Sequence, residues 1–184
     1  MNDASFYPIG TPGQPWGAAE KAQWRARQLP QRRYADDVLP VLEALRSRFD
    51  VSQYDTLDSA PYHSPLFAVR SRDWTPALPT MLVTGGIHGY ETSGVQGALQ
   101  FLQTRAADYA GRANLLVVPC VSPWGYERIQ RWNADAIDPN RSFMANSPAA
   151  ESAALIALVA PLRGSIVMHI DLHETTDTDE TEFR

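Results

Sequence analysis

The chain has 184 residues, of which 44% are hydrophobic and 20% are charged, and this balance excludes an intrinsically disordered protein. Its formal net charge of −5 argues against a nucleic-acid partner. The single cysteine, Cys120, excludes an internal disulfide and any metal site built from several cysteines. No apolar run approaches the ~20 residues of a membrane span, and no basic segment followed by an apolar stretch marks a secretory signal. We therefore expect a soluble, cytoplasmic protein without a membrane partner.

The order of the expected elements predicts an α/β domain. Prolines and glycines are frequent before residue 20, so we expect residues 1–33 to form an irregular leader and residues 34–184 to form the domain itself. Residues 34–49 carry apolar side chains at helical spacing, which predicts an amphipathic helix. Strands and helices then alternate, which is typical of a largely parallel sheet. The further expected elements are strands at 51–57, 66–70, 81–84, 114–121 and 165–173, and helices at 92–107 and 149–162.

Polar clusters follow or end three of the expected strands. They are GGIHGYE (residues 85–91), DPNR (residues 138–141) and DLHE (residues 171–174). In an open α/β sheet, ligands bind beyond the carboxyl ends of the strands. These three clusters are therefore the candidate site.

Histidine and carboxylate side chains in two of these clusters predict a metal site. On one helical turn, His88 and Glu91 would have Cβ atoms about 5–6 Å apart, although a capping or surface pair is the alternative. In the strand expected at 165–173, His169 and His173 lie about 13 Å apart, so they cannot share one metal. We expect His169 to be a hydrogen-bonded core residue and Asp171 to orient a ligand or a neighbouring backbone segment. The set His88, Glu91 and His173 leaves a fourth position for water, as a catalytic zinc site requires.

The DPNR cluster is a candidate carboxylate-binding site. The planar guanidinium of Arg141 can bind a carboxylate with two hydrogen bonds, and Asn140 can supply an amide donor to the same anion. The alternative is a salt bridge from Arg141 to Asp135 or Asp138.

A further arginine can approach the metal and polarise the carbonyl group that is to be cleaved. Arg131 is one candidate and Arg128 is the other. Hydrophobic periodicity does not separate them, so both remain open at this point.

Taken together, the three clusters resemble the ordered motifs of the zinc metallocarboxypeptidases of the carboxypeptidase A type. The same core is shared with the succinylglutamate desuccinylase and aspartoacylase branch, and the resemblance covers roughly residues 34–178. It implies a three-layer α/β/α sandwich around a mixed, mostly parallel sheet. The roles that it implies are one zinc ion on His88, Glu91 and His173, an oxyanion-stabilising Arg131, and a substrate carboxylate held by Asn140 and Arg141.

The resemblance implies hydrolysis by a zinc-activated water, most simply the removal of C-terminal residues from peptides. An N-acyl amino acid deacylase is the alternative. We favour the peptidase because of the Gly-Tyr-Glu sequence at 89–91 and the long region before it. The expected partner is a peptide or N-acyl amino acid with a free carboxylate, and the sequence does not indicate the oligomeric state.

The sequence departs from the family pattern at the general base, a glutamate expected on a later strand. Glu174 should point away from the face that presents His173, and nothing directs Glu180 or Glu182 toward the metal. A non-catalytic zinc- or carboxylate-binding module is therefore a further alternative. We also expect that the C-terminal part of the domain is missing, that a sheet edge is left uncovered, and that the 184-residue chain alone is inactive.

Overall fold

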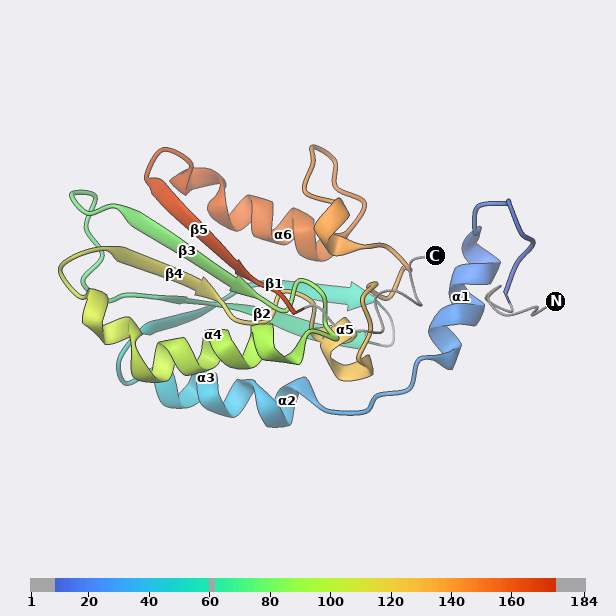
Figure 1. The fold of residues 1–184 in the computed structure, drawn as a ribbon, viewed down its shortest axis with the longest axis horizontal. Coiled ribbons are helices and arrows are strands. Elements are labelled where there is room, and N and C mark those ends of the chain that lie inside the picture. Colours follow the sequence, from blue (N-terminus) through green and yellow to red (C-terminus); the bar gives the residue numbers. More distant parts are fainter. Residues whose placement is uncertain (1–8, 60–61, 175–184) are drawn as a thin grey trace.

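The computed structural model describes residues 9–59 and 62–174 (Figure 1). The start of the expected leader, together with Glu180 and Glu182, lies outside the described residues. The described strands form one mixed sheet in the order β1–β2–β4–β3–β5. These strands are β1 (Asp50–Ser59), β2 (Tyr62–Arg70), β3 (Thr80–Gly85), β4 (Asn114–Val118) and β5 (Ile166–Leu172).

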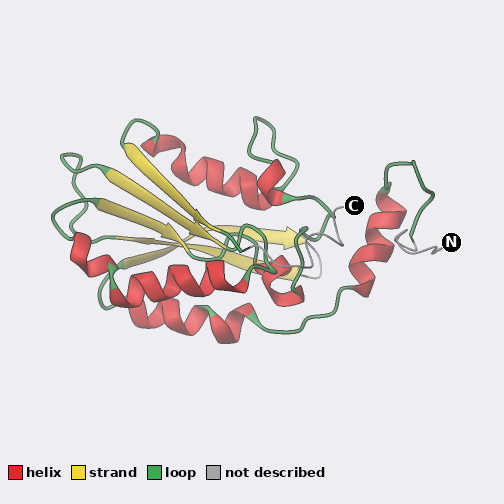
Figure 2. Cartoon of the chain, viewed as in Figure 1, coloured by secondary structure: helices red, strands yellow, loops and turns green. Residues whose placement is uncertain are grey.

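Helices cover both faces of the sheet (Figure 2). In Figure 1, α3 and α4 lie on one face and α6 lies on the other, which gives the three layers that the family resemblance implied. None of the helices in the described part of the chain has the length and apolar character needed to cross a lipid bilayer. The helices are α1 (Ala18–Arg27), α2 (Tyr34–Asp37), α3 (Leu39–Leu45), α4 (Thr92–Thr104), α5 (Pro123–Arg128) and α6 (Ala150–Val159), with short 3₁₀ helices η1 (Ala106–Tyr109), η2 (Pro139–Arg141) and η3 (Ala160–Leu162).

The sheet is mixed, as predicted, but parallel pairing does not predominate among the described strands. β3 pairs in parallel with β4 and with β5, whereas β1 pairs antiparallel with β2 and β2 pairs antiparallel with β4. β1 and β2 pair antiparallel because they follow each other directly in the chain and form a hairpin. The parallel half positions the candidate site, because the carboxyl ends of β3, β4 and β5 lie at the same end of the sheet.

Alternating side chains of the central strands form two hydrophobic layers. On one face Val83 and Val117 pack with α3 and α4 in a cluster that includes the buried Cys120, so this cysteine is a core residue. On the other face Leu82 and Leu116 pack with residues of α6. Both faces of β3 and β4 are therefore covered, as the uninterrupted apolar runs in their sequences require.

The expectation of an irregular leader is wrong for residues 18–27, which form α1. This segment is rich in Ala, Glu, Gln, Lys and Arg, which are strong helix formers, and the prolines and glycines lie before it. The anchor of α1 is Trp24, which is fully buried against Trp124 with ring centroids 5.5 Å apart. Trp16 packs only partly buried against the same cluster. The division between residues 33 and 34 stays a prediction.

Two expected elements are shorter than their apolar patterns indicated. The helix expected at 34–49 is divided at Val38 into α2 and α3. Pro40 lies in the first turn of α3 and has no N–H to continue the hydrogen bonds of α2. The strand expected at 114–121 ends at Val118, and the following residues turn into the unpredicted helix α5.

β5 lies at one edge of the described sheet. Val167, Met168 and Ile170 are exposed there, and Val167 retains 69% of its accessible surface. An uncovered edge strand was expected from the sequence. These exposed apolar side chains lie on both faces of β5, because neighbouring residues of a strand point to opposite faces.

Candidate metal centre

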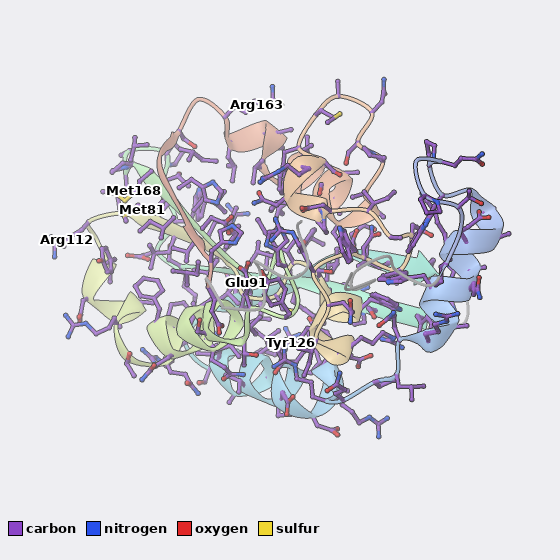
Figure 3. All side chains as sticks on the ribbon, turned by 45° about the vertical axis from the view of Figure 1, so that its right-hand side comes forward. Met81, Glu91, Arg112, Tyr126, Arg163 and Met168 are labelled. Atoms are coloured by element: carbon purple, nitrogen blue, oxygen red, sulfur yellow. The ribbon has the colours of Figure 1, made fainter. Side chains whose placement is uncertain are left out.

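Parallel strands bring the first and third polar clusters to the same edge of the sheet. Thr84 in β3 is paired with Asp171 in β5, and Gly85 is paired with Leu172. His88 and Glu91 lie in the loop between β3 and α4, and His173 follows directly after β5. Figure 3 shows Glu91 at this end of the sheet, away from Met81 and Met168 near the other end.

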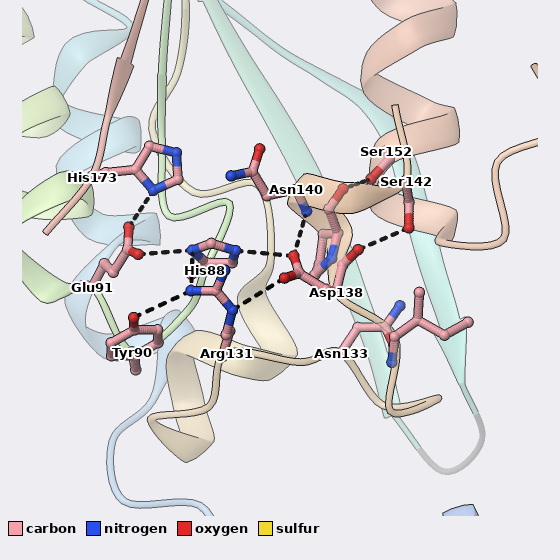
Figure 4. A network of polar contacts seen from close by, with 12 residues as sticks. His88, Tyr90, Glu91, Arg131, Asn133, Asp138, Asn140, Ser142, Ser152 and His173 are labelled. Carbon is pink, nitrogen blue, oxygen red and sulfur yellow. Dashed lines mark hydrogen bonds and ion pairs between the residues drawn. The ribbon is translucent and has the colours of Figure 1, made fainter. Parts of the chain in front are cut away.

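The three predicted metal ligands converge on one point. One ligand atom each from His88, Glu91 and His173 lies within 4.8 Å of the other two. The carboxylate of Glu91 bridges the two rings, since Oε1 lies 2.7 Å from Nδ1 of His88 and Oε2 lies 2.7 Å from Nδ1 of His173 (Figure 4). Each contact carries one proton, which a cation bound among these atoms would replace. The side chains of His88 and Glu91 are 2% and 3% exposed, and that of His173 is 33% exposed, so the site opens on the His173 side.

Each histidine is also held from behind by an aspartate. Nε2 of His88 lies 3.0 Å from Oδ1 of Asp138, and Nε2 of His173 lies 2.6 Å from Oδ2 of Asp171. A carboxylate on the far nitrogen fixes the orientation of a ligand ring and raises its basicity. Both rings therefore present Nδ1 to the same point. The predicted orienting role of Asp171 agrees with this contact.

Opposing effects act on the pKa values of His88 and Asp138. Burial lowers the pKa of His88, but the hydrogen bonds to Asp138 and Glu91 outweigh burial and raise it. Burial alone would raise the pKa of Asp138, yet the hydrogen bond from His88 and the charges of His88 and Arg131 bring it down to about 2. Asp138 is therefore ionised over the physiological pH range and can hold His88 in place.

The structure distinguishes the two candidate arginines by position. The guanidinium of Arg131 donates to Oδ2 of Asp138 over 3.1 Å and lies 3.4 Å from Nδ1 of His88. The guanidinium of Arg128 is instead buried over the rings of Tyr62 and Trp124, with its central carbon 4.1 Å and 4.7 Å from their centroids. Arg131 is thus the arginine beside the candidate metal ligands.

The last three residues of the DPNR cluster form η2, with Asp138 as its N-cap, and the cluster reaches the same site. The backbone N–H of Asn140 donates to Oδ1 of Asp138 over 2.8 Å, and the Asn140 side chain lies beside the histidines in Figure 4. Asn140 and Asp171 line a cavity of about 350 Å³. Arg141 is exposed. Among the described residues, Arg141 forms a salt bridge with neither of the two aspartates that were considered as partners. Asp138 pairs with Arg131, and Asp135 pairs with Arg25.

Two contacts of β5 differ from the prediction or were not predicted. His169 is hydrogen-bonded, as expected, but it is exposed and not a core residue, because β5 lies at the edge of the sheet. Its Nε2 lies 2.8 Å from the hydroxyl of Thr84, which donates to Oδ1 of Asp171 over 2.7 Å. The buried Thr84 was missed because a threonine inside an apolar strand carries no sequence signal for a site. Glu174 turns away, as predicted, and accepts from the N–H and hydroxyl groups of Ser93.

The first turn of α6 holds the loop that presents Asp138. Asn133 donates from Nδ2 to the buried Glu151 over 2.9 Å, and its Oδ1 accepts from the N–H groups of residues 135 and 137. The hydroxyl of Ser152 donates to the carbonyl of Pro139 over 2.6 Å. These contacts fix the backbone on both sides of Asp138.

Glu151 should make stability depend on pH. Burial raises its pKa above the ordinary value of 4.5, the bond from Asn133 opposes this, and the charge of Asp135 adds to it. Since the pKa of Glu151 is higher in the folded protein than in the unfolded chain, its contribution to the free energy of unfolding depends on pH. This contribution is fully present below the pKa of the unfolded chain and is lost as the pH rises through the pKa of the folded protein. Between these two pKa values the free energy of unfolding should fall by up to about 1.4 kcal/mol per pH unit, and Glu151→Gln should remove this fall. Urea unfolding between pH 4 and 8 should show a flatter curve for the variant, and parallel curves would contradict the prediction.

Comparison with known proteins identifies the family of this chain and proteins that share its fold. Residues 54–173 match the family described as "Protein of unknown function (DUF2817)". This chain belongs to that family. The comparison with curated proteins finds no match.

Solved structures similar to this DUF2817 chain share its fold. A protein named "putative metallopeptidase" from Shewanella denitrificans OS217 is 25% identical, with a TM-score of 0.65, over 77% of this chain and 53% of that one. A second protein of that name, from Shewanella baltica OS155, is 26% identical, with a TM-score of 0.60, over 71% of this chain and 51% of that one. A metallo-carboxypeptidase from Pseudomonas aeruginosa, in complex with (2-guanidinoethylmercapto)succinic acid, matches at 20% identity and a TM-score of 0.58 over 76% of this chain and 39% of that one. This DUF2817 chain therefore has a metallocarboxypeptidase-like fold, and it spans about half the length of the two Shewanella proteins.

Proposed function

We propose that this chain carries the zinc-binding centre of a metallocarboxypeptidase that removes C-terminal residues from peptides. The observation that supports this most directly is the convergence of two Nδ1 atoms and one carboxylate, with an aspartate behind each ring. Two histidines and one carboxylate are the donor set of a catalytic zinc site. When bound, zinc would lower the pKa of a bound water toward about 7 and polarise the carbonyl of the scissile bond.

The residues around the ligands would prepare the site for this chemistry. Asp138 and Asp171 would keep the two histidines in the orientation that presents Nδ1. Arg131 carries its charge next to His88, where it could stabilise the negative oxygen that forms on the attacked carbonyl. Asp138 would hold Arg131 at this position through the 3.1 Å contact.

The substrate would be held by its terminal carboxylate. Asn140 lies beside the histidines, and Arg141 follows it on η2 without either predicted aspartate partner among the described residues. A guanidinium and an amide together recognise a carboxylate. We assign no general base within residues 9–59 and 62–174, since Glu174 is bound to Ser93.

Binding measurements on the zinc-loaded chain test the proposal. We expect a short peptide with a free C-terminus to bind about 10- to 100-fold more tightly than its C-terminal amide, because the amide loses a charged hydrogen bond. Arg141→Ala should abolish this difference when binding is measured by calorimetry. Arg163→Ala is the matched control, since Arg163 is an exposed arginine away from the ligands (Figure 3).

The same titration distinguishes the other candidate functions. Preference for N-acyl amino acids over peptides would favour the deacylase. Equal binding of the free acid and the amide by the zinc-loaded chain would contradict the proposed recognition of a terminal carboxylate.

A further inference from the structure

Arg32 binds the loop that presents two of the candidate metal ligands. Its guanidinium donates from Nη2 to the carbonyl of Gly89 over 2.8 Å and from Nη1 to the hydroxyl of Thr92 over 2.6 Å. Its Nε donates to the carbonyl of Tyr126 over 2.6 Å. Arg32 precedes residues 54–173, which match the family, and no sequence motif pointed to it.

The acceptors of Arg32 lie directly beside the candidate ligands. Gly89 follows His88, and Thr92 follows Glu91, so the guanidinium forms hydrogen bonds with the loop on both sides of Glu91. The loop is also in backbone contact with α5, since a Cβ atom on Gly89 would lie 1.9 Å from the carbonyl carbon of Gly125. Through its third bond Arg32 ties the loop to α5 and thereby fixes its position.

Only an arginine can make this set of contacts. The guanidinium stacks on the ring of Tyr126, with its central carbon 3.7 Å from the ring centroid, while three of its nitrogens donate in the plane of the group. Lysine has a single nitrogen and no planar face, so it cannot reproduce both the stack and the separated donors.

The backbone of this segment is held independently of the Arg32 side chain. The N–H groups of Gln31 and Arg32 donate to the carbonyl of Glu127 over 2.7 Å and 3.2 Å. The N–H group of Tyr34 donates to Oε1 of Glu127 over 3.1 Å. Loss of the side chain should therefore release the metal loop without detaching residues 31–34 from α5.

We propose that Arg32 is a positioning residue of the metal centre, which holds residues 88–92 so that His88 and Glu91 meet His173. This inference rests on the proposed metal-binding function. The expected loss of metal affinity in Arg32→Ala is about 10- to 100-fold, the range for residues that act through metal ligands.

The test uses the full chain with Co²⁺ and Zn²⁺ as probes. The measurements are metal affinity by chelator competition and the visible absorption of bound Co²⁺, with folding checked by circular dichroism. We expect Arg32→Ala to weaken binding and change the Co²⁺ spectrum, and Arg32→Lys to behave similarly. Millimolar guanidinium should restore affinity in Arg32→Ala, whereas urea should not. Arg33→Ala is the matched control, because the side chain of Arg33 is 75% exposed and pairs only over 3.8 Å with Asp36 among the described contacts.

The outcomes separate the inference from the function on which it rests. A wild-type chain that binds neither metal would overturn the proposed function and the role of Arg32 together. A wild-type chain that binds metal, with unchanged affinity and spectrum in folded Arg32→Lys or Arg32→Ala, would overturn the role of Arg32 alone. If Arg32→Ala does not fold, Arg32→Lys decides the question, because it keeps the charge and the aliphatic stem.

Discussion

The His88→Ala variant should lose its bound zinc, with an affinity at least about 100-fold lower than that of the wild-type chain. The change removes one of three donors and leaves the carboxylate of Asp138 without the ring that it orients. Glu91 and His173 would remain as two ligands, which is fewer than the three protein ligands of catalytic zinc sites. Equilibrium dialysis followed by metal analysis should find one equivalent in the wild-type chain and almost none in the variant.

A second histidine provides the control for this experiment. His63 lies in the β1–β2 hairpin and is 69% exposed, with Nδ1 2.6 Å from Asp58. His63→Ala should therefore leave zinc binding unchanged. Zinc at 100 times its dissociation constant should also stabilise the wild-type chain by about 2.7 kcal/mol and the His88→Ala variant hardly at all. Equal zinc content in both variants would show that the His88 cluster is not the metal site.

Two glycines of α4 should respond to alanine with opposite signs. A Cβ atom on Gly94 would lie 2.3 Å from the carbonyl oxygen of Leu172, whereas one on Gly97 would meet only the Leu172 side chain at 3.6 Å. The first contact involves backbone, which no change of side-chain conformation relieves. Gly94→Ala should therefore destabilise the fold by about 3 kcal/mol, at the upper end of the cost of overpacking.

Gly97→Ala is the matched control, because it makes the same change on the same helix, where the added Cβ atom makes only an ordinary van der Waals contact with the Leu172 side chain. It should stabilise the chain by up to about 1 kcal/mol, the difference between glycine and alanine inside a helix. Urea unfolding of both variants measures the difference. Gly94→Ala should also weaken zinc binding, since Leu172 immediately precedes His173. Equal stabilities of the two variants would contradict the close approach of α4 to β5.

The sequence was sufficient to predict the candidate ligands because they lie in short motifs at strand ends. His88 and Glu91 follow an apolar run that ends in glycine, and His173 ends the strand expected at 165–173. The rule that parallel strands present their carboxyl ends at one edge then places them together. The rule applies because β3 and β5 are adjacent and parallel.

The residues that support the ligands were not predicted for a different reason. Thr84, Arg32 and Glu151 act through contacts with residues far away in the chain. None belongs to a local motif, and each has an ordinary structural interpretation in its own segment. The helix α1 was missed because the frequency of proline and glycine before it outweighed its favourable helix propensity.

The sequence by itself determined the alternation of strands and helices and the identity of the candidate ligands. These properties depend on hydrophobic periodicity and on residue type, which are local. The tertiary structure alone decided the strand order, the position of Arg128 over the rings of Tyr62 and Trp124, and the exposure of His169 at the sheet edge. These depend on which segments pack together, and the free energy of such packing is shared among residues that no local pattern connects.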